Sequence, residues 1–174
     1  SSAASDVYKR QHITYLLKQE KSDLNGNASI EQENTNLSSG FIEIDWQSNM
    51  LYALPFSEAH FIQKPTPPVI KEKGKDPMTG NEMIYNLKTK KGKIKKGKTK
   101  ADEGHYTGSQ IRNQSDNVVF IENSTYTTCD LDTAHFHFES KKMKIIQNDL
   151  VIAKPIILHL GQIPIMGIPL GCLL

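Results

Sequence analysis

The sequence is poor in the residues that support disulfide-rich or membrane-spanning proteins. It holds two cysteines and one tryptophan in 174 residues, and aromatic side chains make up 7% of the chain. If Cys172 belongs to a foreign end, as argued below, Cys129 stands alone and cannot form a disulfide within the domain. No apolar run reaches the roughly 20 residues of a membrane-spanning helix, and mean hydropathy is −0.47. We expect one domain that folds in water.

The chain also lacks a large net charge of either sign. Lysine and arginine number 21 against 19 acidic residues, so the net charge is +2. The bases are unevenly placed, since 11 of the 21 lie between Lys71 and Lys100. Only Tyr85 and Tyr106 accompany this run, so it lacks the interleaved aromatics of a nucleic-acid site. We predict no nucleic-acid partner and interpret the lysines as solvated turns, with phosphate binding left open.

Apolar residues recur with a period of two. In residues 41–46 Ile42, Ile44 and Trp46 alternate with carboxylates, and in residues 135–139 Phe136 and Phe138 alternate with polar residues. Such alternation is typical of strands with one dry and one wet face. A helical pattern is present only weakly, in residues 14–21. The sequence predicts an all-β fold.

Polar clusters separate the predicted strands. Turns are expected at residues 25–27, 38–40, 47–49, 91–92 and 147–149, and the Pro/Lys/Gly-rich residues 64–80 are expected to form a surface loop. This spacing favours an open β-jelly roll, a V-shaped, flattened solenoid-like sandwich, and a closed sandwich remains an alternative. The side chains expected on its apolar inner face are Ile42, Ile44, Trp46, Met83, Tyr85, Leu87, Val119, Ile121, Phe136, Phe138, Ile156, Leu158 and Leu160.

Catalytic and metal-binding patterns are incomplete. Cys129, His135 and His137 lack the further ligand of a structural zinc site, and no motif supplies a base that would activate Cys129. Asp130 and Asp132 are candidates for the carboxylate pair that a polysaccharide-active enzyme on a parallel β-helix needs, but they fall in a predicted turn. We predict no catalytic residues, no metal and no cofactor.

The two ends of the chain differ in character from the rest. Residues 1–11, Ser-Ser-Ala-Ala-Ser-Asp-Val-Tyr-Lys-Arg-Gln, resemble a translated sequencing adapter, and residues 172–174 fit the opposite adapter end. Residues 1–11 also lack the apolar segment of a signal peptide. We therefore expect the domain to comprise residues 12–171.

Several short motifs in residues 40–170 occur in a characteristic order. They are Tyr-Asn-Leu-Lys-Thr-Lys-Lys-Gly at 85–92, Gly-His-Tyr-Thr-Gly at 104–108, Tyr-Thr-Thr-Cys-Asp at 126–130, Ser-Lys-Lys-Met-Lys-Ile-Ile-Gln-Asn-Asp at 140–149 and Ile-Pro-Ile-Met-Gly-Ile-Pro at 163–169. This order resembles the periplasmic part of the lipopolysaccharide-assembly outer-membrane protein family (LptD, OstA-like), in its Bacteroidetes and Chlorobi form. Gln147 departs from the family's usual proline.

The resemblance implies a non-enzymatic role in lipopolysaccharide transport at the periplasmic face of the outer membrane. The thirteen inner-face residues would contact lipid A acyl chains, other β-rolls would stack on the open edges, and an outer-membrane barrel with its lipoprotein plug would follow. An oxidising compartment would also permit an interdomain disulfide from Cys129, although a buried free thiol is the alternative. Two other functions remain open: a soluble periplasmic bridge or structural β-solenoid without a barrel, and the β-helix enzyme.

Overall fold

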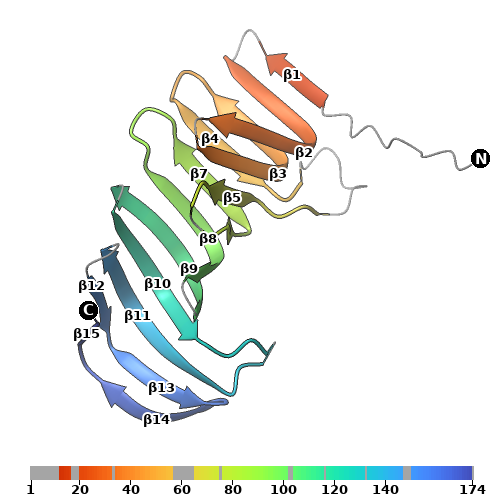
Figure 1. Cartoon of the computed structure of the whole chain (residues 1–174). Helices are drawn as coiled ribbons and strands as arrows, with labels where there is room; N and C mark the ends of the chain where they lie inside the picture. The colour runs from red at the N-terminus through yellow and green to blue at the C-terminus, as the bar shows by residue number, and fades with distance from the viewer. Residues whose placement is uncertain are drawn as a thin grey trace, which may run out of the picture.

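The computed structural model describes residues 12–16, 20–32, 34–56, 65–74, 76–101, 104–115, 117–131, 133–146 and 150–173. Fifteen strands within these ranges form one sheet, a curved stack that runs from β1 to the β12–β15 and β13–β14 edges (Figure 1). The strands are β1 His12–Leu16, β2 Lys21–Gln32, β3 Thr35–Asp45, β4 Met50–Leu54, β5 Val69–Glu72, β6 Met78–Thr79, β7 Glu82–Asn86, β8 Gly92–Ala101, β9 Gly104–Ser115, β10 Val118–Thr127, β11 Phe136–Ile146, β12 Leu150–Lys154, β13 Ile156–Leu160, β14 Ile163–Ile168 and β15 Gly171–Leu173.

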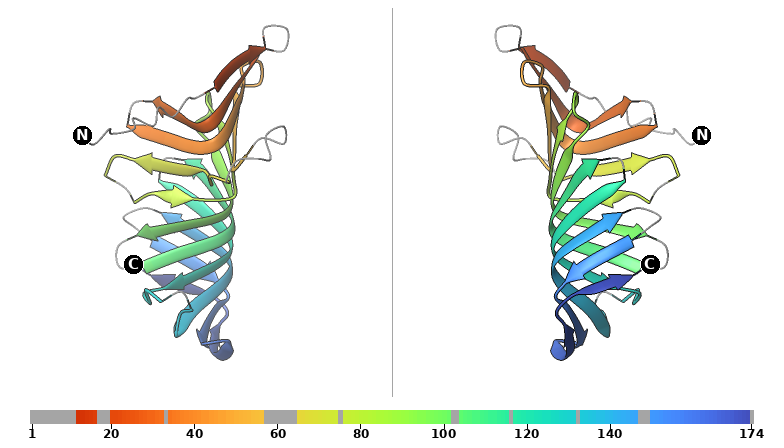
Figure 2. Two further views of the ribbon diagram at one scale, coloured as in Figure 1. Left: turned by 90° about the vertical axis from the view of Figure 1, so that its right-hand side faces the viewer. Right: turned by 90° about the vertical axis from the view of Figure 1, so that its left-hand side faces the viewer.

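The long strands each belong to two walls of the sheet. The C-terminal half of β3 pairs with β4, whereas its N-terminal half pairs with β5. In the same way β8 pairs with both β7 and β6, and β11 pairs with both β12 and β13. We call the part that contains β4, β7, β12 and β15 the first wall, and the part that contains β5, β6, β13 and β14 the second wall. The two walls meet where the long strands bend, and they diverge from there as a V (Figure 2).

Small residues line the inside of this bend. The bend row consists of Ala28, Ser39, Gly97, Gly108, Ser124 and Ser140, all buried, and they pair across neighbouring strands. A Cβ on Gly108 would lie closer than 3.0 Å to Cγ2 of Ile121. Because the walls are nearest to each other here, only small side chains fit between them.

The bend also interrupts the period of two. Ile121 and Ser124 both point inward although they are three residues apart, and Asn123 between them has a φ of 46°. Strand β2 bends through a bulge in which Gly26 and Asn27 have φ values of 81° and 57°. A residue in the left-handed region or a bulge turns the chain, so inward residues on one wall are out of phase with those on the other.

Two buried clusters hold the walls together. The first joins Ile42 and Met83 of the first wall to Leu37 of the second, and the second packs Ile111 and Ile121 against residues of both walls. Ile94 contacts both clusters. The hydrophobic core is therefore continuous along the stack and lies in the angle of the V.

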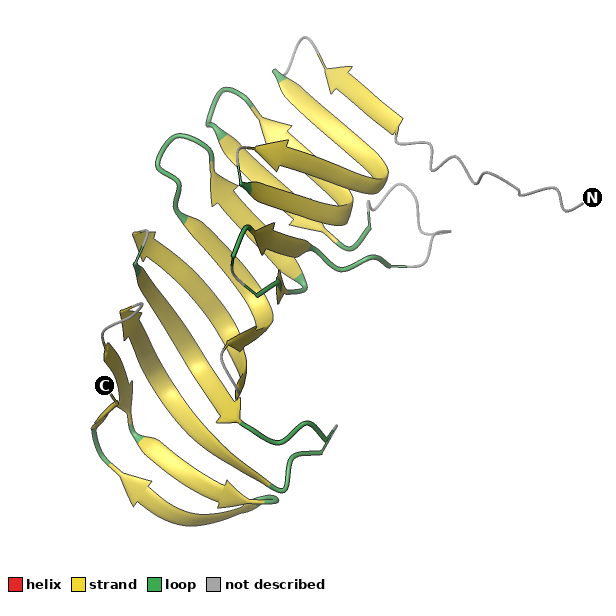
Figure 3. Cartoon of the chain, in the orientation of Figure 1, coloured by secondary structure: helices red, strands yellow, loops and turns green. Residues whose placement is uncertain are grey.

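The predicted fold class is confirmed. Every regular element within the described ranges is a strand, as Figure 3 shows, and every pairing between them is antiparallel. No helix among the described residues is long and apolar enough to cross a membrane. A parallel β-helix, which the enzyme alternative requires, is not the architecture of these strands.

Several local predictions were wrong. The turns expected at residues 25–27 and 38–40 lie inside β2 and β3, because their small and polar residues form the bend. Residues 64–80, expected to be a loop, contain β5 and β6, and the weak helix of residues 14–21 overlaps β1 and β2. The predicted adapter at residues 1–11 and the turn at 147–149 lie outside the described residues. Of the predicted adapter residues 172–174, Cys172 and Leu173 pair with β12, the last residue lies outside the described residues, and the adapter origin stays a prediction.

Candidate functional site

An unbroken row of non-polar residues crosses the inner face of the first wall. Direct strand-to-strand pairing joins Leu24, Ile42, Ala53, Met83, Ile94, Ile111, Ile121, Met143, Ala153 and Gly171. We call this set the floor row. All but Ile94 and Gly171 are at most 8% exposed. At about 4.8 Å between strands, ten strands give a row roughly 43 Å long.

A second row runs parallel to the floor row, two residues nearer the open side of the V. This mouth row contains Ser22, Ile44, Leu51, Tyr85, Gly92, Asn113, Val119, Ile145 and Val151. Its first three members are buried, whereas Tyr85, Val119, Ile145 and Val151 are only half-buried. The inner face is therefore more accessible from β7 onward than at β2 to β4.

The second wall presents a matching row. It comprises Ile30, Leu37, Ile70, Met78, Thr99, Tyr106, Tyr126, Phe138, Leu158 and Met166. Its aromatic members stack in series, with ring centroids 4.7 Å apart for Tyr106 and Tyr126 and 6.4 Å apart for Tyr126 and Phe138. Together the three rows give the V a lining that is non-polar on both sides except at Ser22, Asn113 and Thr99.

The structure places all thirteen predicted residues at inner-face positions or at their rim. Ile42, Ile44, Met83 and Ile121 are buried in the angle of the V. The half-buried members are Tyr85, Leu87, Val119, Phe136, Phe138, Ile156 and Leu158. Trp46 and Leu160 are 47% and 58% exposed, because they stand at strand ends beside the rim. Lipid binding by this set remains a proposal.

Several lining residues escaped the sequence analysis. Ile111 and Met143 belong to the floor row, and Tyr106 and Tyr126 belong to the second wall. Their strands carry the phase change at the bend, so a window centred there shows no period of two. The buried small residues at three-residue offsets from inward isoleucines are the signal that could have revealed them.

Charged side chains occupy the outer face. Glu43 pairs with Lys21 at 2.9 Å and Glu82 with Lys95 at 2.7 Å, and Arg112 pairs with Glu122 across β9 and β10. An outer-face phenylalanine, Phe120, has the ammonium of Lys144 5.9 Å from its ring centre. The run of lysines thus lies largely along outer strand positions and strand connections.

The residues that the sequence analysis weighed as catalytic or metal-binding candidates lie near the β10–β11 connection. Cys129 Sγ is 3.9 Å from His135 Nδ1, and His105 contacts Asp130 at 2.8 Å. The hydrogen bond from His105, with the nearby Lys100 ammonium, lowers the pKa of Asp130. Asp132 lies outside the described residues. Cys129 is half-buried with a free thiol, and an interdomain disulfide from it stays a prediction.

The last strands expose apolar side chains. Ile163, Ile165, Met166 and Ile168 of β14 are 70%, 58%, 52% and 42% exposed, and among the described strands β14 pairs with β13 alone. A sheet edge with unpaired backbone groups and apolar side chains is a surface on which another strand can pair.

Comparison with known proteins gives matches to solved structures, and none to family models or curated sequences. Nine chains of known structure match, among them LptH from Pseudomonas aeruginosa, described as the LptA-homologous periplasmic component of the lipopolysaccharide transport device. The match to LptH has a TM-score of 0.44 and 15% sequence identity, and it covers 63% of this chain and 78% of that one.

Proposed function

We propose that this chain carries the acyl chains of lipopolysaccharide between its two walls, as one β-roll of a periplasmic bridge. The observation that carries the proposal is the non-polar lining, which is continuous from β2 to β15 and faces a V that is open on one side. The ordered motifs of residues 40–170 support the same function through their resemblance to lipopolysaccharide-assembly proteins.

The rows have different roles in this proposal. The floor row is closed by contact between the walls and acts as the hinge side of the trough. The half-buried residues of the mouth row and second wall, such as Tyr85, Val119 and Phe138, are the ones that contact lipid. Shielding a methylene from water contributes about 0.8 kcal/mol, so about ten shielded methylenes contribute about 8 kcal/mol. The lining is roughly 43 Å long, against about 15 Å for one leaflet of a bilayer's hydrocarbon.

The edges support the proposed partners. A second β-roll that pairs with β14 or β15 would extend the lining and cover the exposed isoleucines of β14. The finer proposal, an LptD-like chain at the outer membrane followed by a barrel, rests on the sequence motifs alone. Reading the source DNA beyond Leu170 separates the two versions, because a barrel would appear as successive strands of about ten residues with aromatic girdles.

A charge substitution tests the trough. In Phe138→Asp, an unpaired carboxylate in the apolar lining costs several kcal/mol, so binding of purified lipopolysaccharide to the chain should weaken more than tenfold. Phe120→Asp is the matched control, since Phe120 is on the outer face and 37% exposed. Equal affinity in the two variants, with both folded, would contradict the proposal.

A further inference from the structure

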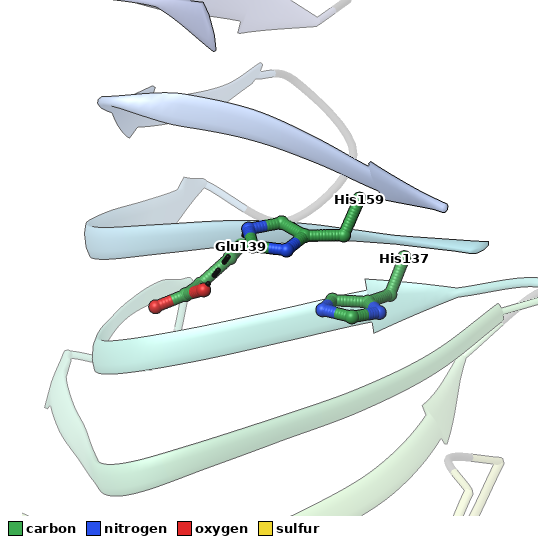
Figure 4. Close-up of side chains that lie close together, drawn as sticks. All are labelled: His137, Glu139 and His159. Carbon is green, nitrogen blue, oxygen red and sulfur yellow. Dashed lines mark ion pairs between the residues drawn. The ribbon is translucent and has the colours of Figure 1, made fainter. Parts of the chain in front are cut away.

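We propose that His137, Glu139 and His159 form a binding site for a divalent transition-metal ion on the outer face of the second wall. Figure 4 shows the three side chains gathered on neighbouring strands. One potential ligand atom from each lies within 4.8 Å of those of the other two. The site is independent of the apolar lining, because it lies on the opposite face of β11 and β13.

The register of the sheet brings these residues together. His137 of β11 pairs directly with His159 of β13, and Glu139 is two residues further along β11, so its side chain points to the same face. The imidazole rings stack with centroids 4.7 Å apart and an angle of 12° between planes. Both strands are held by backbone hydrogen bonds, so the three ligands start from fixed positions.

The side chain of His159 is largely buried beside a carboxylate. Its side chain is only 15% exposed, and Nε2 lies 3.3 Å from Glu139 Oε2. The geometry is not that of a hydrogen bond, and Nε2 is buried without a hydrogen-bond partner among the described residues. A buried ring nitrogen that lies beside a carboxylate without forming a hydrogen bond is poorly satisfied. A cation between the two would satisfy both groups.

The donor set selects the class of ion. Two imidazole nitrogens and one carboxylate oxygen are ligands that zinc prefers, and three protein ligands leave a fourth position for water or a partner. In a tetrahedral site with bonds of about 2.0–2.2 Å, ligand atoms lie about 3.3 Å apart. The three ligand atoms, which lie within 4.8 Å of one another, would therefore have to move closer together on binding. Magnesium and calcium favour all-oxygen sites and should not compete.

A bound ion would cross-link β13 to β11. Four residue pairs join these strands, from Phe136–Leu160 to Glu139–Ile157, and β13 is the one described strand that pairs with β14. Because the ion binds the folded strands and not the separated ones, it would stabilise the β13–β14 hairpin. That hairpin is the edge of the second wall, where its apolar residues are exposed.

Zinc titration into the metal-free, purified chain tests the proposal. We expect one zinc ion per chain by calorimetry, no response to magnesium, and slower amide exchange in β13 and β14 with zinc present. His159→Ala should abolish binding and Glu139→Gln should weaken it at least tenfold, while both keep the metal-free melting temperature. His137→Gln, which retains polarity, provides a second check if His159→Ala does not fold.

Two control variants distinguish this site from zinc binding at the other histidines or at Cys129. Cys129→Ser and His105→Ala should bind zinc as the unaltered chain does, and the cobalt complex should lack a thiolate charge-transfer band. The proposal is overturned if no saturable binding occurs. It is equally overturned if Cys129→Ser or His105→Ala abolishes binding while folded variants of His137, Glu139 and His159 retain it.

Discussion

Gly108 offers a direct test of the bend that creates the V. In Gly108→Ala the new Cβ would lie closer than 3.0 Å to Cγ2 of Ile121, a floor-row residue that is 3% exposed. Ile121 is confined between β9 and β11 and cannot rotate into solvent. Overpacking of this kind costs typically about 1–3 kcal/mol, which for a chain of this size corresponds to a fall of roughly 2–12 °C in melting temperature.

Thermal unfolding of the single variant and of a double-mutant cycle measures this cost. Gly167→Ala is the matched control, since an added Cβ there has no atom within 4 Å, and its melting temperature should remain unchanged. Ile121→Ala removes the clashing methyl group, so Gly108→Ala should be less harmful in that background, with a coupling of about 1 kcal/mol or more. A neutral Gly108→Ala, or no coupling to Ile121, would refute the packing argument.

Three further predictions concern single side chains. Burial and the nearby Glu43 carboxylate raise the pKa of Asp23, so its ionised form destabilises the fold: Asp23→Asn should melt higher than the unaltered chain at pH 7, and the gain should vanish below pH ~3.9, the unfolded value. The pKa of Asp130 is lowered by its hydrogen bond to His105, so the pair's stabilisation is present above the unfolded value and lost as the pH falls through the folded one. In an NMR titration His105→Ala should shift that pKa upward, and no shift would contradict the contact. Ile165→Lys, at a site 58% exposed, should reduce self-association in light scattering and change the unfolding free energy by less than about 0.5 kcal/mol.

Within a single wall, the sequence was sufficient to predict structure. Ile42 and Ile44, or Phe136 and Phe138, lie on straight segments where side chains alternate strictly, so their common face follows from spacing. The same reasoning fails across the bend, where Ile121 and Ser124 share a face at an offset of three. The small and polar residues at the bend are also typical of turns. For that reason the sequence predicted turns within β2 and β3, where the structure has continuous strands.

The pairing register between strands that are distant in the sequence cannot be predicted from the local pattern of apolar residues. His137 faces His159 because β12 pairs with the C-terminal half of β11 and β13, which follows it, pairs with the N-terminal half. In the sequence, His137 is nearer to Cys129 and His135, which suggested a different and incomplete ligand set. The short strands β5 and β6 were missed for a related reason, since they are stabilised by pairing with β3 and β8 and carry no alternating pattern of their own.

Photo-crosslinking from matched phenylalanine positions tests the central claim most directly. A photoreactive phenylalanine analogue at Phe138 lies in the lining, whereas the same analogue at Phe120 lies on the outer face beside Lys144. The chain is incubated with lipopolysaccharide and irradiated, and adducts are counted by mass. The trough predicts strong capture at Phe138 and little at Phe120. Equal capture from both faces, or none from Phe138 in a folded chain, would contradict the account.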